Sequence, residues 1–259
     1  MAPDPQGSAD PQDAAAGDRP TDLHGPAASD IIDVRLLEAL RAEGCPVCVV
    51  RARSEKGILD TIINERVLDR GFRSDLERRQ AFCRRHVAAL VSTDRRETGG
   101  ILGSSLLLGA ILDRRIADLG TAVGSRGRDL RHRLKDARLR PPCLVCSQGA
   151  TAVETALVRF AERSRDGAWA AVLAEAPFCL DDFLALWSNA GPERAFEPVA
   201  RAQLARFGAL SRRLEGFAHH SSHDRRHLLT DEERGAADEG TRALGGDPAR
   251  GGDHRKGGR

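Results

Sequence analysis

The six cysteines of this chain lie in four short stretches, and these stretches form two pairs of similar spacing. The first pair is CPVC at residues 45–48 and CRRH at 83–86, with 34 residues between them. The second pair is CLVC at 143–146 and CLDD at 179–182, with 32 residues between them. Two ligands three residues apart that meet a second such couple form the pattern of a tetrahedral zinc site. A metal held this way constrains the fold, because it joins segments that are distant in sequence.

We expect the two stretches of each pair to share one metal. The first set is a complete Cys3His set and predicts a closed structural zinc site: Cys45, Cys48, Cys83 and His86. The second set carries a carboxylate in place of the imidazole: Cys143, Cys146, Cys179 and Asp182. Asp181 is the near alternative, but its spacing does not match the first set. Aspartate ligates zinc through oxygen and is a harder ligand than the thiolates. Whether the second set binds zinc therefore stays an open question.

Other interpretations of the cysteines also remain. Free cysteines pack as small buried hydrophobes, which would make the second set an eroded copy kept for packing. Iron–sulfur clusters usually take four cysteines, and each set offers three. A redox-active CxxC is expected in a βαβ context. Metal content and thiol reactivity distinguish these alternatives.

The rest of the sequence indicates an all-α fold. The chain has no tyrosine and only 4% aromatic residues, whereas helix-forming alanine, leucine and arginine dominate. The segment AFCRRHVAALV, which starts at Ala81, is similar to PFCLDDFLALW, which starts at Pro177. This similarity and the matched intervals predict two tandem helical repeat units packed about a pseudo-twofold axis, each with a CxxC…CxxH-like metal site.

The sequence predicts six parts: a disordered tail (1–29), a first helical repeat with the Cys3His site (30–123), a basic linker (124–142), a second repeat with the Cys3Asp site (143–190), C-terminal helices (191–246) and a second disordered tail (247–259). We expect a helical hairpin between Cys48 and Cys83, with a metal at its mouth. The most apolar helix, over 97–122, is expected to fill the space between the repeats.

Two motifs near the C-terminus complete the local predictions. Thr230 and Glu233 have the spacing of a capping box and predict a last helix of about 15 residues. A group of histidines precedes it and predicts either a metal pair, if helical, or a polar hydrogen-bonding segment: His219, His220, His223 and His227. Asp224 and Arg225 are expected to form an ion pair between the repeat units.

These motifs together resemble an uncharacterised bacterial family of unknown function, whose members have tandem units running from CPxC to GFCxxH. The matching segments are CPVC at 45, NERVLD at 64–69, AFCRRH at 81, CLVC at 143, PFCLDD at 177 and SHDRRHLLTDEE at 222. The resemblance covers roughly residues 35–246. It departs at Asp182, where the family commonly has histidine, and at CLVC, which lacks the proline. It implies the architecture and the metal sites, and no reaction.

Net charge, the length of apolar runs and the absence of common motifs argue against several classes of function. The net charge of +2 gives no strong electrostatic case for nucleic acid, and no apolar run approaches the ~20 residues that span a bilayer. No signal-peptide pattern is present, so we expect a cytoplasmic protein. Phosphate-loop, hydrolase and metalloprotease motifs are absent. We therefore predict a non-enzymatic, zinc-stabilised scaffold or adaptor that binds another protein. The alternatives are a metal- or redox-responsive regulator that uses the CxxC thiolates, and an enzyme with an open second site.

Overall fold

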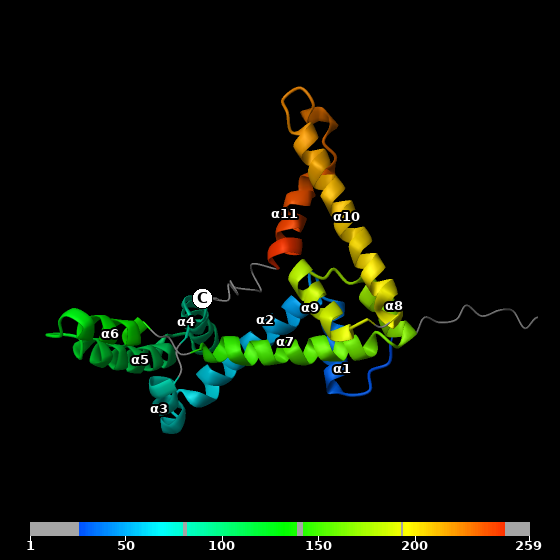
Figure 1. The fold of residues 1–259 in the computed structure, drawn as a ribbon. Coiled ribbons are helices and arrows are strands. Elements are labelled where there is room, and N and C mark those ends of the chain that lie inside the picture. The colour runs from blue at the N-terminus through cyan, green and yellow to red at the C-terminus, as the bar shows by residue number, and fades with distance from the viewer. Residues whose placement is uncertain (1–25, 80–81, 139–141, 193, 247–259) are drawn as a thin grey trace, which may run out of the picture.

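The structure, a computed structural model, describes residues 26–79, 82–138, 142–192 and 194–246 (Figure 1). These residues form helices and no β-strand, which confirms the predicted all-α class. The helices are α1 (Ile31–Leu40), α2 (Pro46–Thr61), α3 (Arg70–Arg79), α4 (Arg84–Thr98), α5 (Leu102–Gly120), α6 (Gly127–Arg138), α7 (Leu144–Arg163), α8 (Gly167–Glu175), α9 (Leu180–Ala190), α10 (Glu197–His220) and α11 (Asp231–Gly245). A π-helical turn, η1 (Ile62–Arg66), extends α2, and short 3-10 turns precede α10 and α11.

Two long helices, α2 and α7, lie side by side and antiparallel at the centre of the molecule (Figure 1). Gly149 of α7 permits their close approach, because a Cβ atom at this position would lie 3.0 Å from Cγ of Glu55 on α2. Pro46 occupies the first turn of α2, where its missing N–H costs no helical hydrogen bond. The antiparallel arrangement places the start of each long helix beside the end of the other.

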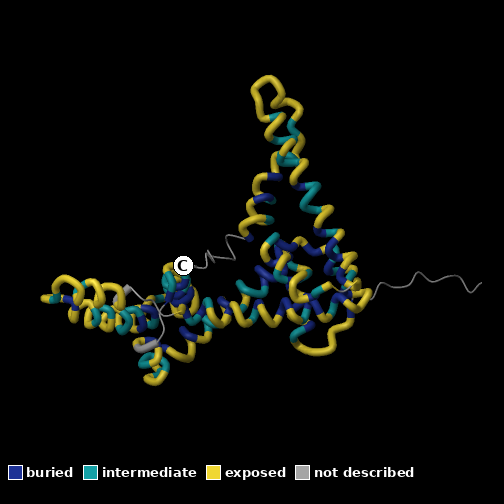
Figure 2. Tube along the Cα trace, in the orientation of Figure 1, coloured by how far each residue is buried: buried dark blue, intermediate teal, exposed yellow. Residues whose placement is uncertain are grey.

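Each end of this central pair has its own apolar core, seen as two regions of buried chain in Figure 2. At the N-terminal end of α2, the core joins α1, the C-terminal half of α7, α8, α9 and the start of α10. At the other end, Leu59 and the η1 turn pack with α3, α4 and α5 and with the start of α7. The valines of the two CxVC motifs, Val47 and Val145, are both fully buried, one in each core.

Helix ends follow the sequence signals closely. The Asp30 carboxylate caps α1 by accepting a 2.9 Å hydrogen bond from the backbone N–H of Asp33. Thr230 and Glu233 form the predicted capping box at the start of α11, which has 15 residues. Residues 1–25 and 247–259 of the expected tails lie outside the described residues. Residues 26–29 of the first tail are described, and there Ala27 accepts a 3.2 Å hydrogen bond from the indole N–H of Trp169.

Two expectations about the long-range arrangement are wrong. The chain between Cys48 and Cys83 forms no hairpin that returns to its start, because α2 and η1 run on to the other end of the molecule. The apolar helix α5 does not fill the space between the halves, since α2 and α7 pack directly on each other. It contacts α3, α4 and α6 instead, and the expected basic linker contains α6 (Figure 1).

The C-terminal helices α10 and α11 form a projecting arm, whose base rests on α8 and α9 and whose tip is exposed (Figures 1 and 2). Helix α10 ends at His220, so His223 and His227 lie beyond it and no four-residue helical couple forms. In the described part of the chain, no candidate metal group includes these histidines. Asp224 and Arg225 do lie 3.6 Å apart, but both belong to the tip of the arm and do not link the two halves.

Candidate metal centres

The eight predicted ligands gather in two clusters. However, each couple of ligands, that is, two residues three apart in sequence, meets a couple from the other half of the chain and not the expected one from its own half. The histidine site comprises Cys83, His86, Cys143 and Cys146, and the aspartate site comprises Cys45, Cys48, Cys179 and Asp182. Each site therefore takes its CxxC couple from one half of the chain and its CxxH or CxxD couple from the other. The expected pairing within each half is wrong. In each cluster the four ligand atoms lie within 4.8 Å of one another.

The exchange follows from helix length. Helix α2 and the η1 turn together cover residues 46–66. At about 1.5 Å per residue, they carry the chain about 30 Å away from Cys45 and Cys48. The next couple, Cys83 and His86, therefore lies at the far end of the central pair, where α7 begins. Helix α7 then carries the chain back, so Cys179 and Asp182 reach the start of α2.

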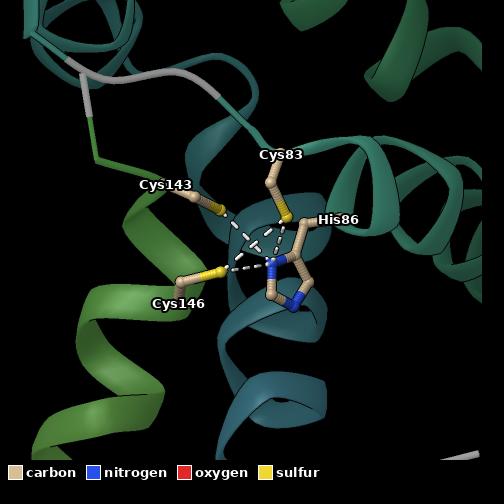
Figure 3. Close-up of side chains that lie close together, drawn as sticks. All are labelled: Cys83, His86, Cys143 and Cys146. Atoms are coloured by element: carbon tan, nitrogen blue, oxygen red, sulfur yellow. Dashed lines mark hydrogen bonds between the residues drawn. The ribbon is translucent and has the colours of Figure 1, made fainter. Parts of the chain in front are cut away.

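The histidine site is arranged around the Nδ1 atom of His86 (Figure 3). This atom lies 3.3 Å from each of the three sulfur atoms, those of Cys83, Cys143 and Cys146. The Sγ atoms of Cys83 and Cys146 are 3.8 Å apart. With Zn–S bonds of about 2.3 Å, the edge of a regular tetrahedron is about 3.8 Å. The Cys83–Cys146 distance matches such an edge, and the four ligand atoms lie close enough together to share one metal ion.

The aspartate site has the same compactness and deeper burial. The Oδ2 atom of Asp182 accepts hydrogen bonds from the thiols of Cys45 and Cys48 at 3.3 Å and from Cys179 at 3.1 Å. All four residues are buried, whereas Cys83 and Cys146 of the histidine site are half-buried. Asp182 rather than Asp181 thus belongs to the cluster, but of the three thiols that it meets only Cys179 was expected beside it.

All four couples stand at helix N-termini. Cys45, Cys83, Cys143 and Cys179 are the N-cap residues of α2, α4, α7 and α9, and their partners follow three residues later. The free N–H groups and the helix dipole at such positions stabilise thiolate charge. Each site therefore receives the N-termini of two helices, which favours four closely spaced ligands of which three or four are anionic.

A buried carboxylate supports the histidine site from behind. Glu55 of α2 accepts two 2.7 Å hydrogen bonds from the guanidinium of Arg85. Its Oε2 atom also lies 3.5 Å from Nε2 of His86, on the side of the ring opposite the sulfur atoms. A carboxylate at the second ring nitrogen fixes the orientation and tautomer of a metal-binding histidine and raises its basicity. At 3.5 Å the contact is an ion pair rather than a hydrogen bond, and it places Glu55 where its charge can orient the ring of His86.

The aspartate site has a basic side chain beside its carboxylate. The guanidinium of Arg51 on α2 lies 3.7 Å from Oδ1 of Asp182. Relative to their CxxC couples, Arg51 corresponds to Gly149 of α7 and Glu55 corresponds to Val153. The two charged groups therefore do not occupy equivalent positions of the repeat, because Arg51 contacts the site whose CxxC lies on its own helix and Glu55 contacts the site whose CxxC lies on α7. Arg51 offsets the additional negative charge that Asp182 brings to three thiolates.

The protonation preferences of the two sites differ. Burial disfavours charge on both His86 and Cys143, but contacts with Cys143 and Glu55 outweigh it and raise the pKa of His86 to about 9. The hydrogen bond with His86 likewise overcomes burial and lowers the pKa of Cys143 to about 6. In the aspartate site, hydrogen bonds with Cys45 and Cys48 raise the pKa of Cys179, and burial raises that of Asp182. Without metal, the histidine site favours an imidazolium–thiolate pair, whereas the raised pKa values of Cys45 and Cys179 keep these two thiols of the aspartate site protonated.

The projecting arm covers the aspartate site. A Cβ atom at Gly246, which follows α11, would lie 3.3 Å from Sγ of Cys48. A small cavity beside Cys45 and Cys179 is closed on its other side by residues of α10 and α11, among them Phe207 and Arg242. The arm thus accounts for part of the difference in burial between the two sites.

Sequence reasoning missed the supporting residues Glu55 and Arg51, although a signal was present. Arg51 lies three residues after Cys48, about one helical turn along the same face, and Glu55 lies seven residues after Cys48, about two turns along it. Charged residues on the face of a helix that carries metal ligands are candidates for the supporting layer. Only the antiparallel packing of α2 on α7 shows which site each residue serves, because Glu55 supports the site at the opposite end from Cys48.

Substitution Glu55→Gln should weaken metal binding at the histidine site alone. The amide keeps the size of the side chain but loses the charge that orients His86, so we expect a 10–100-fold lower zinc affinity there. Competition with a chromophoric chelator measures this affinity site by site. The matched control is Glu65→Gln, which removes an exposed carboxylate from η1. Equal loss in both variants, or loss at the aspartate site, would contradict the assigned role.

Fold and sites together define an all-helical protein with two four-residue clusters that can each hold a metal ion. The chain belongs to a family of unknown function (DUF6062), which matches residues 28–195. This match spans both clusters and ends before α10. No curated protein and no solved structure matches the chain. None of the helices in the described segments combines the length and apolar character needed to cross a membrane.

Proposed function

We propose that the protein is a non-enzymatic scaffold or adaptor whose two halves are joined by two zinc ions and which binds another protein. The observation that carries this proposal is the exchange of ligand couples between the halves. Each site takes two residues from each half. One metal would tie α4 to α7, where Cys83 and Cys146 are 63 residues apart, and the other would tie α2 to α9, where Cys45 and Asp182 are 137 residues apart. Two such links would make the halves one rigid body.

Zinc is the metal that the ligand sets support best. Three thiolates with one imidazole form a common structural zinc set, and the spacing of 3.3–3.8 Å at the histidine site fits a tetrahedron. Three thiolates with one carboxylate form a weaker set, but full burial, helix N-termini and Arg51 favour metal there as well. Four protein ligands leave no open coordination position, which supports a structural role over catalysis.

The repeat interpretation supports the same proposal. Cys45 and Cys143 have nearly identical backbone angles, with φ/ψ of −63/123° and −64/124°. Cys83 and Cys179 share another conformation, with −72/165° and −72/159°. Couples of the same type thus have the same local geometry in both halves. We infer a duplicated unit whose copies exchanged their ligand couples across a pseudo-twofold axis between α2 and α7.

A second candidate, a redox-responsive regulator, is favoured by one observation. Cys83 and Cys146 are half-buried and their sulfur atoms are 3.8 Å apart, so an oxidant such as hydrogen peroxide has a path to this site. Hydrogen peroxide would oxidise the two zinc-bound thiolates to a disulfide; the peroxide takes two electrons from the sulfurs and two protons from solvent to become two water molecules, and the zinc ion is released. The buried aspartate site would respond more slowly.

The test is the metal and thiol content of protein purified without chelator. Two zinc ions per chain, with six cysteines that resist a thiol reagent under native conditions, are the result expected of the scaffold. Rapid zinc release with peroxide at submillimolar concentration, reversed by a reductant, favours the regulator. A brown iron-containing protein, or six freely reactive thiols without metal, would overturn both. Capture of a partner by the zinc-loaded protein, lost with chelator, tests the adaptor role directly.

A further inference from the structure

Helix α5 contains eight leucine and isoleucine residues, yet most of its residues are exposed. Of the 19 residues of α5, only Ser104 and Leu107 are buried. Its inward face packs against the core through Leu107, Leu108 and Ile111. Its outward face carries residues at alternating spacings of three and four, which we call the α5 stripe: Leu102, Ser105, Gly109, Leu112, Ile116 and Leu119. All six are exposed.

The exposed apolar area is too large for a monomer surface of ordinary composition. Leu102, Leu112, Ile116 and Leu119 are between 50% and 73% exposed. The neighbouring Ile101 and Leu106 are 44% and 38% exposed. At roughly 150 Å² of apolar surface for a fully exposed aliphatic side chain, the exposed fractions of these six residues correspond to about 500 Å² on one copy and about 1,000 Å² on two. That area is the lower bound for a specific protein–protein interface, and patches of this size mark interaction sites.

The spacing identifies the kind of partner. Residues that alternate at intervals of three and four form the a and d positions of a heptad, the seam of a helix pair. The two halves of the stripe differ in size. The first half contains the small residues Ser105 and Gly109, whereas the second half contains Leu112, Ile116 and Leu119. A shallow hollow lies over the small residues, lined by Ser105, Leu106, Gly109, Ala110, Asp113, Arg114 and, from α3, Glu77.

The stripe is therefore complementary to itself in one direction only. In an antiparallel pair of α5 helices, Leu112 of one copy faces Gly109 of the other, and Ile116 faces Ser105. Large side chains then fill the hollow of the partner on both sides of the axis. In a parallel pair, the small residues would face each other and leave voids, which cost stability. The terminal segments 1–25 and 247–259 contain only Met1 and Leu23 as large aliphatic residues, so they lack the apolar surface to cover the stripe.

We propose that the protein forms a homodimer through an antiparallel pair of α5 stripes, with the aliphatic half of each stripe seated on the small-residue half of the other. Such an interface is isologous and closed, as a twofold axis requires. It lies away from the aspartate site and the arm. The dimer would present two copies of the remaining surface to a partner, and none of the eight clustered residues lies in the stripe.

The test is the mass of the full chain, with its metals as purified, by analytical ultracentrifugation at 1–100 μM. We expect twice the chain mass of 28.0 kDa for the native sequence. Leu112→Asp should raise the dissociation constant at least 100-fold, because it buries a charge in the seam. The matched control is Leu228→Asp at the tip of the arm, where the leucine is 50% exposed, and it should remain dimeric.

Gly109→Leu separates the antiparallel pair from other arrangements without endangering the fold. A Cβ atom at Gly109 meets no other atom within 4 Å, and leucine is a better helix former than glycine. This variant should keep its helix content and become monomeric, since the added side chain occupies the space of the partner's Leu112. A Gly109→Leu protein that dimerises as strongly as the native chain would overturn the proposal, as would a native chain that stays monomeric at 100 μM.

Discussion

A double substitution at Cys83 and Cys143 should leave one zinc ion bound, whereas a double substitution at Cys45 and Cys83 should remove both. In the exchanged arrangement, Cys83 and Cys143 belong to the same histidine site, and Cys45 belongs to the aspartate site. Pairing within each half of the chain predicts the reverse for the two variants. Serine replacements keep the size of the side chain but remove the thiolate. Zinc per chain, measured by mass spectrometry of the elements, distinguishes the two arrangements.

Single substitutions decide the case in which the native protein binds only one zinc ion. If His86 holds that ion, as loss of zinc in His86→Ala would show, Cys143→Ser should abolish binding and Cys45→Ser should preserve it, while the opposite result would show pairing within each half. Hydrogen exchange adds a second readout, because each site borders a separate core. Loss of the histidine site should speed amide hydrogen exchange in α4 and α5, and loss of the aspartate site should speed it in α8 and α9. Structural zinc contributes about 10–16 kcal/mol in zinc-finger peptides, so these effects should be large.

The exchange of couples marks the limit of what the sequence predicts here. Residue types and three-residue spacings identified all eight members of the two clusters, because these are local properties of a helix N-terminus. The caps at Asp30 and Thr230 were predictable for the same reason. Which couple meets which depends on the direction of the long helices. Neither the intervals of 34 and 32 residues nor the similar segments around Cys83 and Cys179 carry that information.

The position of α5 was missed for a related reason. Its apolar residues predicted a central helix, since burial is the usual fate of such a segment. Close packing of α2 on α7, made possible by Gly149 against Glu55, leaves no space between the halves. The stripe on α5 then remains outside, where a second copy of the chain can cover it. A mismatch between apolar sequence and exposed position is thus evidence for an interface.

The supporting layer shows that the two sites differ in more than one ligand. Glu55 stands behind an imidazole and Arg51 stands beside a carboxylate, so each site has a counter-charge suited to its fourth ligand. An eroded second site would have no need of a basic group at this position. The pairing of Arg51 with Asp182 therefore supports a functional aspartate site rather than a degenerate copy.

Removal of metal should reverse the pH dependence of stability. In the metal-free fold, the pKa of His86 is raised from 6.5 to about 9, and that of Cys146 is raised from 9.0 to about 12. The pKa values of Cys45 and Cys179 are raised as well. A group whose pKa is raised by folding stabilises the protein below its unfolded pKa and loses that contribution as the pH rises. Cys143 acts in the opposite sense, because folding lowers its pKa from 9.0 to about 6, so between about pH 6.5 and 9 its growing contribution offsets the loss through His86. The metal-free protein should therefore lose stability mainly above about pH 9, through the thiols whose pKa values are raised.

The zinc-loaded protein should show the opposite slope. Its ligands must be deprotonated to bind, so protons compete with zinc as the pH falls, and stability should decline below about pH 6 but hold at pH 10. Each proton taken up or released changes the free energy of unfolding by up to about 1.4 kcal/mol per pH unit. Urea unfolding under reducing conditions at pH 6, 8 and 10, with and without chelator, gives both slopes. Restored zinc should restore the loaded behaviour. Identical slopes in the two series would mean that the folded chain holds no metal, because only metal fixes these eight side chains in their deprotonated forms.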